Sequence, residues 1–215
     1  FMYFRSRRTA GLSLESALAL YCGDEDFISK SNSYSGRNCD LYPTLRNHTN
    51  IKDVDVKGHT VIATVRNPWE RVVSRYLRFC EERRYISFHE FLTRSLNIYH
   101  MPFNSNNQKL KPTALPVALD WLDWYTETLD GAYDKVNMWV RYDHLKNDIN
   151  IIEEKFQFKG LYETFKSFTF HDHDRPKITN LYKYFEERGC LEFVPPLSLV
   201  FQKDINMFEY KLYKK

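Results

Sequence analysis

The chain of 215 residues carries 31 Lys and Arg against 28 Asp and Glu, a formal net charge of +3. Its 43% hydrophobic content predicts one globular domain over residues 1–215, and so small a basic excess argues against nucleic acid as a partner. No run of about 18 apolar residues occurs, which predicts no membrane span. The four cysteines are widely spaced and form no CxxC pair, so we expect no zinc site and reduced thiols, with a single disulfide as the alternative.

Strands and helices are expected to alternate along the chain. Residues 1–5 are mostly apolar and predict a buried strand, residues 12–20 predict a helix, and residues 31–50 predict a loop. The later expected elements are a strand over 59–65, a helix from Pro68 to about Cys80, a helix capped by Ser87, a loop over 97–116, a strand over 137–141, and helices near 147–156, 179–188 and 196–208. This order predicts an α/β fold with a mainly parallel sheet, whose ligand site lies at the carboxyl ends of the strands.

The first strand-to-helix junction has the composition of a phosphate-binding loop. Ala10 and Gly11 are small enough for backbone N–H groups to approach a ligand, and the helix start adds partial positive charge. Arg8 adds a fixed cation. The predicted binding residues are Arg7, Arg8, Thr9, Ala10, Gly11, Leu12 and Ser13. No G-x-x-x-x-G-K-[ST] sequence occurs, which disfavours a standard nucleoside triphosphatase. The alternative is a helix that follows a basic loop and binds nothing.

The second junction places cationic groups around another helix start. Arg66 ends the expected strand, while Asn67 and Pro68 suit the beginning of a helix. Arg71 and Ser74 are three residues apart and share one face of that helix. Two guanidinium groups and a hydroxyl at a helix N-terminus predict a site for a phosphate dianion. The alternative is an Arg that pairs with a neighbouring carboxylate.

The second junction, Arg66-Asn-Pro-Trp-Glu-Arg-Val-Val-Ser74, resembles the R-N-P-x-x-R-x-x-S segment of sulfotransferases that use 3′-phosphoadenosine 5′-phosphosulfate (PAPS). It is most similar to the carbohydrate sulfotransferases, including the heparan sulfate 2-O-sulfotransferase group. The resemblance implies that Arg66 and Ser74 hold the 3′-phosphate of PAPS. Residues 7–13 then resemble the family's P-K-T-G-G-T-S loop for the 5′-phosphosulfate, with Arg8 in place of Lys and Leu12 in place of the second Thr.

Three further segments resemble the same family. Residues 140–145, V-R-Y-D-H-L, resemble its R-Y-E-x-L element, and residues 201–210 resemble the Y-x-x-D-x-x-x-F-x-Y ending of the carbohydrate group. His48 falls where the 2-O-sulfotransferases carry a catalytic His. The resemblance implies a P-loop-type three-layer sandwich, in which helices flank a central mainly parallel sheet, and a reaction that needs no metal.

The activity implied by the resemblance is transfer of a sulfuryl group from PAPS to an acceptor hydroxyl, on a glycan or glycolipid, by in-line displacement. The predicted catalytic residues are His48, which would take the hydroxyl proton, and Arg8, which would stabilise the leaving phosphate by charge and hydrogen bonding alone because Arg keeps its proton. His100 and Glu15 are rival bases. Two other functions stay open: a non-catalytic module that binds PAPS or adenosine 3′,5′-bisphosphate, and a small-molecule kinase with an atypical phosphate loop.

Two remaining features concern metals and location. His171-Asp-His-Asp174 alternates possible metal ligands, but no further ligand is evident, so we predict no metal. The abundance of Asn, Lys, Tyr and Phe favours a microbial cytoplasmic enzyme, and the alternative is a domain of the Golgi lumen whose anchor has been removed. A first residue inside an expected strand predicts a truncated N-terminus.

Overall fold

The computed structural model divides into two compact units. The first unit comprises Phe1–Arg66 with Thr128–Arg175, and the second comprises Asn67–Glu127 with Pro176–Lys215. A single domain over the whole chain stays a prediction. The structure describes residues 1–4, 10–23, 27–30, 45–47, 55–83, 86–98, 133–168, 178 and 180–212.

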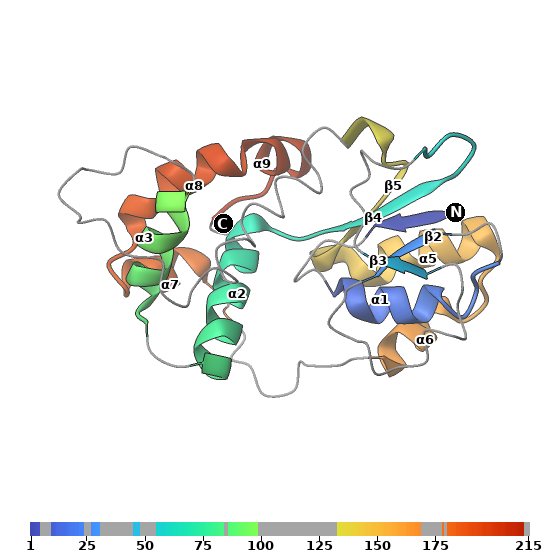
Figure 1. Ribbon diagram of the computed structural model, residues 1–215, viewed down its shortest axis with the longest axis horizontal. Coiled ribbons are helices and arrows are strands. Elements are labelled where there is room, and N and C mark those ends of the chain that lie inside the picture. Colours follow the sequence, from blue (N-terminus) through green and yellow to red (C-terminus); the bar gives the residue numbers. More distant parts are fainter. Residues whose placement is uncertain are drawn as a thin grey trace. The chain divides into compact units, whose positions relative to one another are not determined.

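The first unit contains a five-stranded sheet in the order β3-β2-β1-β4-β5, and each neighbouring pair of strands is parallel (Figure 1). Its strands are β1 (Met2–Phe4), β2 (Phe27–Lys30), β3 (Leu45–Asn47), β4 (Val61–Val65) and β5 (Met138–Arg141). The predicted α/β class and parallel sheet are therefore confirmed. The strands β2 and β3 were not expected, and β3 lies inside the predicted loop 31–50, because strands of three or four residues show too little alternation to be recognised.

Three helices of the first unit pack against one face of this sheet (Figure 1). They are α1 (Gly11–Leu18), α5 (Leu145–Phe156) and α6 (Leu161–Ser167). Successive side chains of a strand point to opposite faces, so Tyr3, Ile62 and Val140 join these helices in one buried core, whereas Met2 and Phe4 pack on the other face with Val61. The parallel sheet with helices is thus established, and the three-layer P-loop arrangement stays a prediction.

Helix α6 is an element that the sequence pattern did not predict. A turn after α5 leads into it, and Gly160 at this turn has a φ of 78°, a conformation that suits Gly. The carboxylate of Glu153 accepts the N–H groups of Gly160 and Tyr162, at 2.9 and 3.2 Å, and so caps the new helix. A cap that comes from the preceding helix depends on the fold of the turn, which explains why local pattern missed it.

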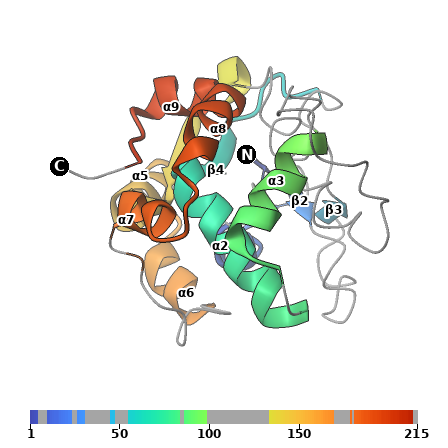
Figure 2. The ribbon, with the colours of Figure 1, turned by 90° about the vertical axis from the view of Figure 1, so that its left-hand side faces the viewer.

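The second unit is helical in its described part. Its helices are α2 (Pro68–Arg83), α3 (Phe88–Ile98), α7 (Leu181–Glu186), α8 (Val194–Val200) and α9 (Gln202–Phe208), and two of them, α2 and α3, are drawn in green in Figure 2. Aromatic rings join them: the ring centroid of Phe185 lies 5.0 Å from that of Phe88 and 6.2 Å from that of Trp69. Tyr76 of α2 also packs on Phe88, at 4.9 Å. An aromatic cluster therefore connects α2, α3 and α7.

The expected helix over 196–208 is two helices. Phe201 separates α8 from α9 with φ −101° and ψ 17°, outside the α-helical region. Its side chain is buried, 2% exposed. The hydrophobic pattern continues across this residue, so the sequence did not indicate the break. The burial of the Phe201 ring is consistent with tertiary packing as the cause of the break.

Candidate functional site

The strand order defines where a ligand site is expected in the first unit. The sheet runs outward from β1 to β2 and β3 on one side, and to β4 and β5 on the other. The order therefore reverses between β1 and β4, and in open α/β sheets ligands bind outside the carboxyl ends of the strands at such a switch point. Both junctions singled out in the sequence follow these two strands: Ala10 and Gly11 come after β1, and Arg66 comes directly after β4.

The start of α1 has the backbone geometry of an anion-binding turn. Ala10 has φ 57° and ψ 12°, the left-handed conformation, which is uncommon for a residue with a Cβ. The first helical bond runs from the N–H of Leu14 to the carbonyl of Ala10 at 3.3 Å, and the N-cap residue Ala10 makes no side-chain cap. The N–H groups of Gly11, Leu12 and Ser13 precede that bond, so the helix itself provides them with no acceptor. A left-handed residue beside a helix start aims such groups at one point.

Some groups of this predicted loop already make hydrogen bonds within the protein. Ser13 is buried, and its hydroxyl donates to the carbonyl of Phe168 at 2.8 Å, which ties α1 to the end of α6. One hydroxyl carries one proton, so Ser13 in this conformation can offer a ligand only its backbone N–H and its oxygen lone pairs. Gly11 is also buried, and its carbonyl oxygen accepts a hydrogen bond from the Tyr3 hydroxyl at 3.1 Å.

Arg66 lies at the carboxyl end of β4 with its guanidinium over the ring of Tyr142. The guanidinium carbon is 3.8 Å from the ring centroid, which is a cation–π contact. Parallel pairing aligns Val65 with Arg141, so the residues that follow each strand, Arg66 and Tyr142, emerge side by side. The second junction therefore places the Arg66 guanidinium, in contact with the Tyr142 ring, at the edge of the sheet where a ligand is expected.

Arg141, the last residue of β5, is committed to an internal ion pair. Its backbone N–H and side-chain Nε both donate to one carboxylate oxygen of Asp148, at 2.8 and 2.9 Å. Its Nη2 donates to the other oxygen at 2.7 Å. Asp148 lies in the first turn of α5 and is buried, so this fork holds α5 to the end of β5. Sequence reasoning missed Asp148 and Tyr142 as site residues, although the V-R-Y-D-H-L segment drew attention to this place.

The remaining described residues of the second junction belong to the second unit. Asn67 caps α2 as predicted, since its Oδ1 accepts the N–H of Trp69 at 3.0 Å. Arg71 is buried, and its Nη1 lies 3.8 Å from a carboxylate oxygen of Asp204 on α9. The Arg71 guanidinium also lies 5.2 Å from the centroid of the Phe201 ring. Ser74 is half-buried on the same helix.

Several predicted residues lie outside the described part of the chain. They are Arg7, Arg8, Thr9, His48, His100 and the segment 171–174. The two predicted catalytic residues, His48 and Arg8, are among them. Their roles stay predictions from the sequence.

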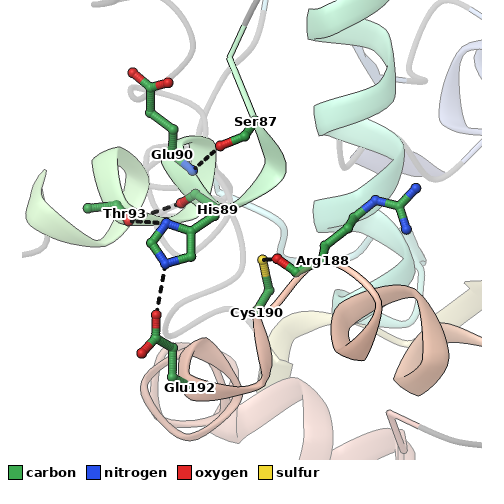
Figure 3. Close-up of polar contacts among 7 residues, drawn as sticks. All are labelled: Ser87, His89, Glu90, Thr93, Arg188, Cys190 and Glu192. Carbon is green, nitrogen blue, oxygen red and sulfur yellow. Dashed lines mark hydrogen bonds and ion pairs between the residues drawn. The ribbon is translucent and has the colours of Figure 1, made fainter.

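A second polar cluster lies on α3 and the segment 188–192 (Figure 3). His89 Nε2 lies 2.9 Å from Glu192 Oε1, and Thr93 Oγ1 lies 3.5 Å from His89 Nδ1. This order of hydroxyl, imidazole and carboxylate is that of a hydrolase triad. However, Thr93 donates its proton to the carbonyl of His89 at 2.9 Å, so the hydroxyl is not directed at the imidazole as a nucleophile requires.

Cys190 beside this cluster is also a poor nucleophile. Burial raises the pKa of its thiol, the charge of Glu192 raises it further, and Arg188 opposes the shift. The thiol donates to the carbonyl of Arg188 at 3.1 Å (Figure 3). Because the thiolate is the reactive form, a thiol held protonated does not support covalent catalysis.

Neither a metal-ligand cluster nor a membrane-spanning helix occurs among the described residues. These residues contain no group of three or more His, Cys, Asp or Glu side chains that could hold a metal ion. Among the helices in the same part of the chain, none combines the length and the apolar character needed to cross a membrane.

Comparison with known proteins adds no relative: no family model, no curated protein and no solved structure matches the chain. The fold and the site together define an α/β protein whose parallel sheet carries a helix start with a left-handed N-cap residue and a stacked Arg at its switch point.

Proposed function

We propose that the chain is a sulfotransferase that moves the sulfuryl group of PAPS to a hydroxyl of a glycan or glycolipid, and that its sheet is the core of a P-loop-type sandwich. The observation that carries this proposal is the switch point between β1 and β4. Both sequence segments with the composition of phosphate-binding loops follow these two strands. The proposed location is the microbial cytoplasm, with the Golgi lumen as the alternative.

The first loop is assigned to the 5′-phosphosulfate. The left-handed Ala10 and the start of α1 offer backbone N–H donors from Gly11, Leu12 and Ser13. Backbone N–H groups bind an anion without a proton transfer, so they suit the phosphosulfate and the phosphate that it leaves behind. Arg8, close by in the sequence, adds the positive charge that a leaving phosphate needs.

Arg66 is assigned to the 3′-phosphate. It follows β4 at the carboxyl edge of the sheet, and its guanidinium contacts the ring of Tyr142. A guanidinium that keeps its full charge is a strong partner for a phosphate dianion. Ser74 is assigned to the same phosphate by the resemblance, and Arg71 by its place on the same face of the helix start as Ser74. Arg71 additionally pairs with Asp204 within the second unit.

When bound, PAPS supplies the sulfuryl group. The acceptor oxygen forms a bond to sulfur as the bond from sulfur to the 5′-phosphate oxygen breaks, and His48 takes the hydroxyl proton. The backbone N–H groups of α1 and the charge of Arg8 stabilise the negative charge that develops on the leaving phosphate. Neither metal nor covalent intermediate is part of this proposal.

A non-catalytic PAPS-binding module is the second candidate, because Arg8 stands where the resembling family carries Lys. Binding and turnover separate the candidates. Adenosine 3′,5′-bisphosphate at 100 times its Kd should stabilise the protein by about 2.7 kcal/mol in thermal unfolding. Stabilisation by ATP with Mg²⁺, without stabilisation by the bisphosphate, overturns both candidates in favour of a kinase. Turnover of radiolabelled PAPS with a panel of glycan acceptors selects the enzyme, and binding without turnover on any acceptor selects the module.

A further inference from the structure

Tyr3 of β1 makes a buried hydrogen bond to the first residue of α1. Its hydroxyl donates to the carbonyl oxygen of Gly11 at 3.1 Å, and the residue is 0% exposed. The strand and the helix, both blue in Figure 1, precede and follow the junction that has the composition of a phosphate-binding loop. The bond therefore ties the strand before this junction to the helix that begins at its end.

This bond also sets the direction of a neighbouring backbone donor. The Gly11 oxygen and the N–H of Leu12 belong to one planar trans peptide group, so they point in opposite directions. In an α-helix the carbonyl groups face the C-terminal end, and the first N–H groups extend from the N-terminal end. A hydroxyl that holds the Gly11 oxygen from within the core thus orients the Leu12 N–H out of the start of α1, where the proposed function places the 5′-phosphosulfate.

The first turn of α1 is held at a second point as well. Ser13 donates its hydroxyl to the carbonyl of Phe168 at 2.8 Å, so Leu12 lies between two residues that are fixed from different elements. Ala10, just before the turn, has a φ of 57°, a conformation that persists for a residue with a Cβ where the surrounding structure imposes it. Donors that are fixed in advance bind an anion with a smaller loss of conformational entropy.

We infer that Tyr3 is a positioning residue, whose hydroxyl preorders the start of α1 for the 5′-phosphate group of the nucleotide. The inference rests on the proposed function, since it names a residue that holds one half of that site. It requires the hydroxyl and not the ring. Tyr3→Phe is the matching variant, because it keeps the ring in the core and removes only the donor.

The test measures, by calorimetry, the Kd of two ligands for the wild type and for Tyr3→Phe. Adenosine 3′,5′-bisphosphate carries a 5′-phosphate, and the substitution should weaken its binding between about 2-fold and 10-fold, the net contribution of one hydrogen bond. Adenosine 3′-monophosphate carries none, so its Kd should be the same in both proteins. An unchanged Kd for the bisphosphate overturns the inference. Equal weakening of both ligands shows a general structural role and overturns it too.

A matched control is Tyr21→Phe. The Tyr21 hydroxyl donates to the carbonyl of Lys159 at 2.8 Å, so this variant also removes one bond from a Tyr hydroxyl to a backbone carbonyl in the same unit. Tyr21 lies beyond the C-terminal end of α1, away from the start of the helix. Its replacement should leave the Kd of both ligands unchanged. A loss of bisphosphate affinity equal to that of Tyr3→Phe overturns the inference.

NMR spectra test the contact itself. An accepted hydrogen bond moves a carbonyl carbon signal downfield, so the Gly11 carbonyl signal should move upfield in ligand-free Tyr3→Phe and stay in place in Tyr21→Phe. In the wild type, the bisphosphate should shift the amide signals of Gly11, Leu12 and Ser13, and the 3′-monophosphate should not.

The outcomes separate the inference from the function on which it rests. Bisphosphate binding that leaves these three amide signals unchanged overturns the inference, whereas the nucleotide-binding function stands. The same holds where the Gly11 carbonyl signal is identical in the wild type and in Tyr3→Phe. Failure of the wild type to bind the bisphosphate overturns the proposed function and the inference with it.

Discussion

Arg66 is held by an aromatic ring 3.8 Å away, at the end of the strand where the switch point predicts a ligand. Replacement by Ala removes a charge-assisted contact to the 3′-phosphate. Arg66→Ala should therefore weaken binding of adenosine 3′,5′-bisphosphate by about 1.5–3 kcal/mol, measured by calorimetry. Arg94→Ala, which removes the same charge from the surface of α3, is the control and should bind like the wild type. Equal affinities in the two variants contradict the assignment.

Cys190 combines full burial with a raised pKa. Its thiol therefore stays protonated at neutral pH, and access to it requires unfolding. In a variant that keeps only Cys22 and Cys190, a thiol reagent at pH 8 should label the half-buried Cys22 first and Cys190 only after urea is added. Mass spectrometry of the labelled peptides distinguishes the two sites. Labelling of Cys190 at the rate of Cys22 in the native protein contradicts its burial.

The ion pair between Arg71 and Asp204 joins two helices, α2 and α9, that are far apart in the sequence. Both side chains are buried, 6% and 2% exposed, so removal of one leaves the other charge without this partner in a poorly solvated place. The pair also connects the R-N-P-x-x-R segment to the segment 201–210, two parts of the chain that resemble sulfotransferase segments.

Asp204→Ala is therefore expected to lower the free energy of unfolding by about 3–5 kcal/mol in urea denaturation. Lys203→Ala, next to it on the exposed side of α9, should change that free energy by less than about 0.5 kcal/mol. Similar effects of the two substitutions would show that the pair contributes no more than a surface charge.

At the scale of the whole molecule, the proposed site draws on segments that the sheet gathers from distant parts of the sequence. Residues 10–13, Arg66 and Tyr142 all follow strands of one parallel sheet. A nucleotide that bridges them should protect their backbone amides together. Hydrogen exchange with adenosine 3′,5′-bisphosphate should slow in peptides that contain Gly11–Leu14 and the end of β4. The peptide over residues 191–200 serves as the internal reference and should exchange as before. Uniform slowing across the chain, or none, contradicts a local site.

Local sequence signals were sufficient to predict those features in which a residue acts on its near neighbours. Ser87 was expected to begin a helix, and its hydroxyl accepts the N–H of Glu90 at 3.0 Å (Figure 3). The Glu90 carboxylate pairs with Arg94 one turn further along the helix. Asn67 likewise caps α2 as predicted, with Pro68 at its first position. The run 61–65, apolar and β-branched, formed the buried strand that its pattern indicated.

Tertiary structure determined the features that no local sequence pattern indicates. The order of the strands, the left-handed Ala10, the contact of Tyr142 with Arg66 and the pairing of Arg71 with Asp204 all depend on which segments meet. The sequence by itself determined the α/β class, the two strand-to-helix junctions and the residue types at them, because hydrophobic periodicity and caps are short-range. The partners of those residues were decided only by the fold, because parallel strands pair segments that lie far apart in the chain.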